Sequence, residues 1–225
     1  MPIMTPTIKY TELKLKAPIV LKAIIPKDNL VGARSKLGST VDTVTVDNVR
    51  YGYSVYMCKE GEPDCATPTK ALTVVFRSER ANNRWVLDVT LEAFYVSPSA
   101  TLTFEIYKFG SETDTIIDVT FRDSFVSVSV NGKSYLDTDT FKKFEQIRQI
   151  ECVSAYLAPD GSTIDPSKLS AYLAFNMQVT QIADASALFN AIIPLAITLA
   201  VIGVVMTLIM TFAKKIPIPK ITPPK

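Results

Sequence analysis

The chain has 225 residues, with 24 basic and 22 acidic side chains and a formal net charge of +2. This balance gives no general reason to expect nucleic-acid binding by the bulk of the chain. Histidine is absent, which excludes Ser-His-Asp and Cys-His catalysis because both need an imidazole as general base. The length is enough for one domain with a substantial core, or for two small ones.

The first seven residues, MPIMTPT, contain two prolines and no basic segment followed by an apolar one. This pattern is not that of a secretory signal. We expect residues 1–7 to form an extended arm, which could tie neighbouring subunits together or simply fray.

Alternating apolar and polar residues, interrupted by turn residues, dominate residues 8–182 and predict short β-strands. Such runs occur within residues 8–25, 41–57, 71–76, 85–91, 102–106, 117–121, 126–130, 152–157 and 169–179. Asn131-Gly132 predicts a two-residue hairpin, because both residues tolerate the positive φ of a type I′ turn. Residues 27–39 carry the turn residues of a loop. The single predicted helix covers Thr140–Gln149, with Asp139 as its N-cap.

Eight to ten short strands with little helix predict an all-β fold. We expect an antiparallel two-sheet jelly-roll sandwich over residues 8–182, with one short helix. The sequence FVSVSVNG, followed by an I-x-x-I segment, resembles a hairpin of galectin and laminin-G-like sandwiches. Galectins recognise sugars through a His, an Asn-Pro-Arg and a Trp-Gly-Glu arrangement. The chain has no His and no Asn-Pro-Arg, and Val86 follows Trp85. We therefore expect Trp85 in the core rather than as a sugar platform.

Three cysteines are present. Cys58 and Cys65 flank a short loop that contains Gly and Pro, and they could form a disulfide or remain two free thiols. Closing so short a loop would contribute roughly 2–3 kcal/mol in the chain-entropy model. Cys152 resembles an ordinary buried thiol. The spacings do not match a zinc site, and we expect no metal and no cofactor.

Residues 185–213 contain no charged side chain, and they predict a carboxy-terminal transmembrane helix. At ~1.5 Å per residue, a helix over residues 191–213 spans roughly 34 Å, enough to cross the ~30 Å hydrocarbon core of a bilayer. Small residues lie at helical spacing and form a candidate seam for helix packing: Ala196, Ala200, Gly203 and Thr207. The tail, residues 214–225, is rich in proline and carries four flanking cations, Lys214, Lys215, Lys220 and Lys225.

The tail lysines could contact anionic lipid headgroups or, weakly, nucleic acid, or they could be a plain stop-transfer flank. The positive-inside rule would place the tail in the cytoplasm. The sequence shows neither a signal peptide nor an Asn-x-Ser/Thr site. Both absences lead us to expect that the domain stays on the side of the membrane where it is made.

The combination of arm, sandwich and carboxy-terminal anchor resembles single jelly-roll capsid or vertex (penton-base) proteins. The relevant viruses are icosahedral viruses with an internal membrane, particularly the turreted viruses of thermophilic archaea. This resemblance implies a structural protein of the virion, located in its capsid and internal membrane. Its partners would be lipid, further copies of itself and other shell proteins, with no small-molecule substrate.

Two alternatives remain open from the sequence. The first is a cell-surface or envelope binding protein with a sandwich ectodomain, which an oxidised Cys58–Cys65 pair would support. The second is a tail-anchored glycosidase, which needs two converging carboxylates. Four acids lie on strand-like segments, namely Asp88, Glu92, Glu105 and Asp118. We expect most of them on solvated strand faces, and we expect no enzymatic activity.

Overall fold

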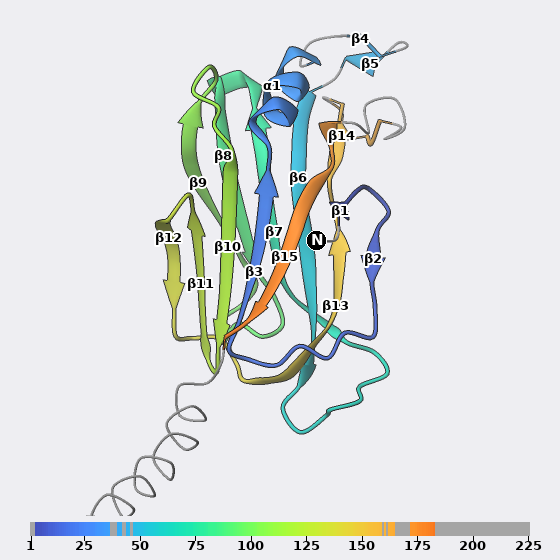
Figure 1. Ribbon diagram of the computed structural model, residues 1–225, viewed down its shortest axis with the longest axis vertical. Helices are drawn as coiled ribbons and strands as arrows, with labels where there is room; N and C mark the ends of the chain where they lie inside the picture. Colours follow the sequence, from blue (N-terminus) through green and yellow to red (C-terminus); the bar gives the residue numbers. More distant parts are fainter. Residues whose placement is uncertain are drawn as a thin grey trace, which may run out of the picture. The chain divides into compact units, whose positions relative to one another are not determined.

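The computed structural model describes residues 3–36, 40–41, 44–45, 47–158, 160, 162–164 and 172–182. They belong to one compact unit that ends at Ile182. Figure 1 shows two antiparallel sheets and a short helix, α1 (Lys27–Lys36), at one end of the sheets. The predicted two-sheet sandwich with one short helix is therefore confirmed.

The first sheet has six strands in the order β1-β15-β3-β10-β11-β12. Their bounds are β1 (Ile3–Met4), β15 (Phe175–Gln181), β3 (Ile19–Ile25), β10 (Thr115–Arg122), β11 (Phe125–Val130) and β12 (Lys133–Thr138). Each pairing is antiparallel. The central strands alternate strictly, as in β3, where every second residue is buried. This alternation puts one face of the sheet in the core and the other in water.

The second sheet has seven strands, in the order β2-β13-β6-β7-β8-β9, with β14 also paired to β6. Their bounds are β2 (Lys9–Tyr10), β13 (Phe144–Cys152), β6 (Asp47–Lys59), β7 (Thr69–Glu79), β8 (Arg84–Leu91), β9 (Ala100–Lys108) and β14 (Ala155–Leu157). A 3-10 turn, η1 (Arg80–Asn82), joins β7 to β8. A separate two-stranded ribbon pairs β4 (Thr40–Val41) with β5 (Val44–Thr45).

Aromatic side chains fill the core between the two sheets. Trp85 is fully buried and stacks on Phe76, with ring centroids 5.1 Å apart and an interplanar angle of 8°. The Tyr51 ring also contacts the indole, with ring centroids 6.3 Å apart and an interplanar angle of 43°. Aromatic pairs of this kind add about 0.5–1.5 kcal/mol to the free energy of area burial. The expectation that Trp85 belongs to the core agrees with this position.

The Asn131-Gly132 hairpin lies at the predicted place, between β11 and β12. The φ angles of the two residues are 50° and 80°, both in the left-handed region that a type I′ turn requires. The Asn131 side chain also accepts a hydrogen bond from the Ile116 backbone N–H at 2.7 Å, which ties the turn to β10.

The helix predicted over Thr140–Gln149 is wrong, because β13 occupies most of that segment. Two bulges interrupt its pairing with β6. One of them places Arg148 as an extra residue, so that Ile147 and Ile150 both oppose inward-facing residues of β6 and are both buried. A bulge changes the strand period locally. The resulting spacing of three residues between buried isoleucines resembles a helical period in the sequence.

The helix of the fold lies instead in the segment predicted to be a loop, residues 27–39. Only Leu30 and Ala33 of α1 are buried. The apolar stripe by which an amphipathic helix is recognised in a sequence is therefore short. Tertiary contacts hold α1 at its place. The Asp114 carboxylate accepts a hydrogen bond from the Lys27 backbone N–H at 2.8 Å, which satisfies a donor that a helix leaves unpaired at its first turn.

The segment predicted as an extended arm pairs within its own chain. Ile3 and Met4 form β1 against Phe175 and Asn176 of β15, and Met4 is fully buried. The predicted transmembrane helix and basic tail, residues 185–213 and 214–225, lie outside the described residues. Within the described part of the chain, no helix is both long and apolar enough to cross a membrane.

Candidate functional site

The cysteines at the end of β6 form a disulfide. Cys58 and Cys65 are bonded, with their Cα atoms 5.7 Å apart, and they close a loop that leads from β6 towards β7. Cys152 is a free buried thiol, and its burial raises the pKa of that thiol. The predicted packing stripe (Ala196, Ala200, Gly203 and Thr207) and the four tail lysines (Lys214, Lys215, Lys220 and Lys225) lie outside the described residues.

The outer face of β7, β8 and β9 carries a network of charges. Asp88 accepts hydrogen bonds from Arg77 at 2.5 Å and from Thr103 at 2.7 Å. Arg84 pairs with Glu79 and, at 2.8 Å, with Glu105. The amide of Asn82 and then the guanidinium of Arg84 hold the pKa of the Glu79 carboxyl below its usual range.

The strand acids considered in the sequence therefore have cationic partners. Asp88 and Glu105 belong to the network above, Glu92 lies 3.6 Å from Lys70, and Asp118 lies 3.7 Å from Lys22. Asp88, Glu105 and Asp118 lie on the outer faces of β8, β9 and β10, as expected, and Glu92 directly follows the end of β8. Their carboxylates neutralise neighbouring cations rather than converge on a common cleft.

A buried carboxylate, Glu112, organises the end of the sandwich at α1. Its side chain is only 2% exposed. One oxygen lies 3.0 Å from Arg34 Nε and accepts a hydrogen bond from Trp85 Nε1 at 3.3 Å, and the other accepts one from the Gly110 backbone N–H at 2.8 Å. Buried charges persist where such partners compensate for lost hydration. Glu112 thus links the core indole, the turn after β9 and the helix.

The position of α1 depends on further contacts with the strand end at β15. The Asn29 amide donates to the Ala174 carbonyl at 2.7 Å, and the Tyr51 hydroxyl donates to the Asn29 carbonyl at 3.2 Å. Gly32 lies so close to Tyr172 that a Cβ at this position would be 2.2 Å from the ring. The helix can reach this packing distance because glycine has no side chain.

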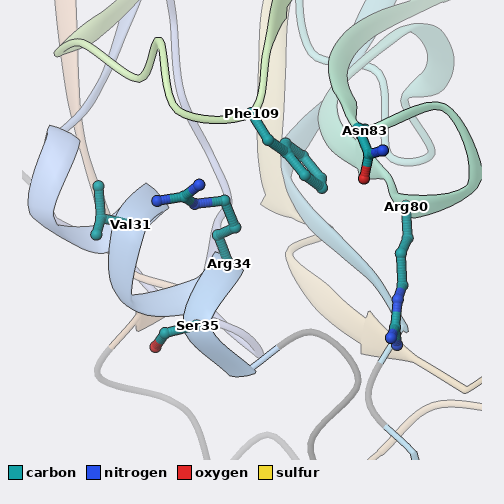
Figure 2. Close-up of a pocket in the computed structure, with 6 residues that line it drawn as sticks. All are labelled: Val31, Arg34, Ser35, Arg80, Asn83 and Phe109. Carbon is teal, nitrogen blue, oxygen red and sulfur yellow. The ribbon is translucent and has the colours of Figure 1, made fainter.

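A pocket of about 410 Å³ opens beside this helix. Figure 2 shows its lining, which α1 and two turns supply: Val31, Arg34, Ser35, Arg80, Asn83 and Phe109. The turns that follow β7 and β9 are tied together, because the Phe109 backbone N–H donates to the Asn83 carbonyl at 2.8 Å. The pocket therefore brings together residues that lie far apart in the sequence.

Sequence reasoning missed this pocket. Arg34 lies in the segment interpreted as a loop, and Glu112 lies in the polar stretch GSETD, which resembles a surface turn. One sequence pattern could have pointed to this end of the fold. In Asn83-Arg84-Trp85, a turn residue and a charged residue directly precede an aromatic residue of the core. Across the described residues, no group of three or more Cys, Asp or Glu side chains has the arrangement of a metal site.

Several strand edges are open in the described structure, and two of them, at β9 and β15, carry exposed apolar residues. β9 pairs only with β8, and Leu102 on β9 is 37% exposed. β1 covers only the first two residues of β15, and no described strand pairs with residues 177–181 on that side. Val179 on this segment is 39% exposed. Unpaired edges of this kind can accept a strand from another chain.

No family model matches the sequence, and the comparison with curated proteins gives no match. Several solved structures are similar in fold. A toad ovary galectin in complex with thio-digalactose has a TM-score of 0.42 and 10% identity, covering 79% of this chain and 100% of that one. Chicken galectin 2 has a TM-score of 0.39 and 10% identity, over 77% and 98%.

The alginate lyase AlyC3 is similar to the same degree, with a TM-score of 0.42 and 11% identity, covering 79% of this chain and 73% of the lyase. None of these three proteins is a capsid protein. With identities of 10–11% and TM-scores of 0.39–0.42, we transfer no ligand and no activity to this chain.

Proposed function

We propose that the chain is a membrane-anchored structural protein of a virion shell, with the β-sandwich as its head. The observation that carries the proposal is the sequence after the sandwich. β15, the last described strand, ends at Gln181, and the uncharged residues 185–213 follow almost immediately. An apolar stretch of this length is typical of a membrane span.

The open edges support the structural part of the proposal. A shell protein works through contacts between copies, and the exposed edges of β9 and β15 are surfaces on which a neighbouring chain could pair. The partners in this proposal are further copies, other shell proteins and lipid, and the basic tail, residues 214–225, would lie near lipid headgroups or the packaged nucleic acid.

The alternative, a surface or envelope binding protein with a sandwich ectodomain, is favoured by the Cys58–Cys65 disulfide. Disulfides persist in oxidising compartments and are rare in the cytosol of mesophiles. Intracellular proteins of hyperthermophiles are the known exception, and a shell protein of such a host would also keep the bridge. The two candidates therefore differ in topology rather than in fold.

Protease protection on intact membranes and on purified particles tests the proposal. Two versions of the full chain would carry a tag either at the amino terminus or after Lys225. The shell protein predicts a protected carboxy-terminal tag and a sandwich on the side where the chain is made. A translocated sandwich with a cytoplasmic tail would contradict it and favour the surface protein.

Removing the residues after Ile182 provides a second test. The proposed anchor predicts that the shortened chain leaves the membrane fraction and keeps the strand content of the full chain, measured by circular dichroism. A shortened chain that is unfolded would mean that residues 185–213 belong to the core, and the anchor would then be wrong.

A further inference from the structure

We propose that the pocket beside α1 binds a small organic oxyanion, a carboxylate or phosphate ester with a flat apolar group. The inference concerns the sandwich alone and does not rest on the membrane role. The pocket has about 410 Å³, within the ~300–1,000 Å³ typical of small-molecule sites. Such sites combine apolar walls with a few placed polar groups, and this lining has both.

The first polar group is Arg34, which is held in place from one side. Its Nε lies 3.0 Å from the buried Glu112 carboxylate. The backbone of Gly110 and the indole of Trp85 fix that carboxylate in turn. The Arg34 side chain is 36% exposed, and its terminal nitrogens have no hydrogen-bond partner among the described residues. A guanidinium fixed at Nε with its terminal N–H groups open is pre-organised for an oxyanion.

The second polar group is Arg80, in the turn after β7. Its guanidinium makes neither an ion pair nor a hydrogen bond with the described part of the chain, and the residue is exposed. Asn83 follows in a left-handed conformation at φ 52°, which closes the turn through a hydrogen bond from its backbone N–H to the Arg80 carbonyl at 3.1 Å. Arg34 and Arg80 thus both line the pocket, and of the two only Arg34 has an ion-pair partner among the described residues. Figure 2 shows the Arg80 side chain extending away from Phe109 and Arg34, so this exposed side chain would turn towards a bound ligand.

The apolar wall defines the rest of the ligand. Phe109 is half-buried, and its ring contacts Trp85 with centroids 5.9 Å apart, so the phenyl group is supported from the core side. In Figure 2 the Phe109 ring and the Arg34 side chain approach the pocket from different elements, the turn and α1. Val31 adds an aliphatic surface on the helix. A ligand with a flat apolar group next to its oxyanion would use both walls.

Calorimetric titration of the full chain in detergent micelles, with four probes, tests this specificity. Benzoate and benzamide share a ring and differ in charge, whereas phenyl phosphate and inorganic phosphate share an oxyanion and differ in the ring. We expect benzoate to bind at least tenfold more tightly than benzamide, since charge-assisted contacts are lost with the amide. Phenyl phosphate should likewise bind more tightly than inorganic phosphate, since only phenyl phosphate has a ring that can contact Phe109. If benzoate binds more tightly than phenyl phosphate, the preferred ligand is a carboxylate. If phenyl phosphate binds more tightly, the preferred ligand is a phosphate ester.

Variants locate the site. Arg80→Gln should weaken benzoate and phenyl phosphate binding by roughly tenfold, as expected for one charged contact. Arg122→Gln is the matched control, because Arg122 is also exposed, has no charged partner among the described residues and lies on β10 away from the pocket lining. Arg34→Lys keeps the charge but loses the forked donors, and Phe109→Leu removes the ring while keeping an apolar side chain. Circular dichroism confirms that each variant is folded.

Three outcomes would overturn the proposal. The first is equal affinity for benzoate and benzamide, which would show that the pocket does not recognise an oxyanion. The second is an equal loss of affinity in Arg80→Gln and Arg122→Gln, which would indicate general charge attraction. The third is the absence of binding by any probe at millimolar concentration in the folded wild-type chain. None of these outcomes bears on the membrane topology, which the protease experiment tests separately.

Discussion

The ion pair between Arg34 and Glu112 should contribute more to stability than any exposed pair of this protein. The perturbation is a double-mutant cycle of Arg34→Met and Glu112→Gln. The Arg34 Nε lies 3.0 Å from a carboxylate that is 2% exposed, so water competes little for the interaction. Breaking a buried pair costs more than breaking a surface pair, because the remaining charge is left without compensation.

The expected magnitudes follow from the three donors around Glu112. The carboxylate accepts hydrogen bonds from Trp85 and the Gly110 backbone and forms an ion pair with Arg34, and a glutamine would turn an N–H₂ group towards one of these three partners. Hydrogen bonds to charged groups contribute about 1.5–3 kcal/mol each, so Glu112→Gln should lower the free energy of unfolding by about 2–4 kcal/mol. Arg34→Met should cost about 1–3 kcal/mol, because Arg34 keeps some contact with water. We expect a coupling energy of about 1.5 kcal/mol.

The assay is urea unfolding of the full chain, followed by tryptophan fluorescence. Trp85 is the only tryptophan, and it lies in the core next to Glu112, so the signal reports on this region. The matched control is the pair Lys16 and Glu145, whose atoms are 3.1 Å apart with side-chain exposures of 58% and 24%. Exposed pairs typically contribute about 0–1 kcal/mol, and we expect the weaker coupling there. A coupling energy at Arg34–Glu112 no larger than that of the control would refute the reasoning.

Three further predictions use the same unfolding assay. Gly32→Ala should destabilise the chain by about 1 kcal/mol, because the new Cβ would lie 2.2 Å from the Tyr172 ring. This steric cost should outweigh the helix propensity of alanine, which by itself favours the variant by about 1 kcal/mol. A stabilised variant would contradict this. Replacing Cys58 and Cys65 by serine should cost about 2.4 kcal/mol, the entropy of a closed loop of about eight residues, and a reducing agent should then have no effect on the variant. Burial raises the pKa of Tyr107 to about 12 from 10.0, so its neutral phenol stabilises the fold fully below pH 10, and this contribution is lost as the pH rises towards 12. Tyr107→Phe should therefore reduce the alkaline loss of stability, and equal pH profiles would contradict the assignment.

Local sequence determined the class of the fold. Strict alternation in β3, β10 and β11 has one physical solution, a sheet with one face in the core. Asn131-Gly132 determined a hairpin because the turn depends only on the φ angles of two residues. The position of Trp85 in the core follows from the apolar residues that alternate after it in β8.

Tertiary structure decided the features that local sequence describes ambiguously. β13 is a strand because β6 offers it a partner, and its bulges produce a spacing of buried isoleucines that imitates a helix. α1 is a helix because Gly32 packs closely on Tyr172 and the Asp114 carboxylate caps its first turn. Neither partner is a neighbour in the sequence, so no local pattern could contain this information.

The candidate pocket likewise depends on both local sequence and tertiary structure. Its residue types are visible in the sequence, but Arg34, Arg80 and Phe109 lie in three segments that meet only when both sheets are formed. The sequence by itself determined a sandwich, a hairpin and an uncharged stretch at residues 185–213, because each depends on the order of neighbouring residues. Only the tertiary structure decided where the helix lies, which carboxylate is buried and which cations share a pocket, because each depends on contacts between distant segments.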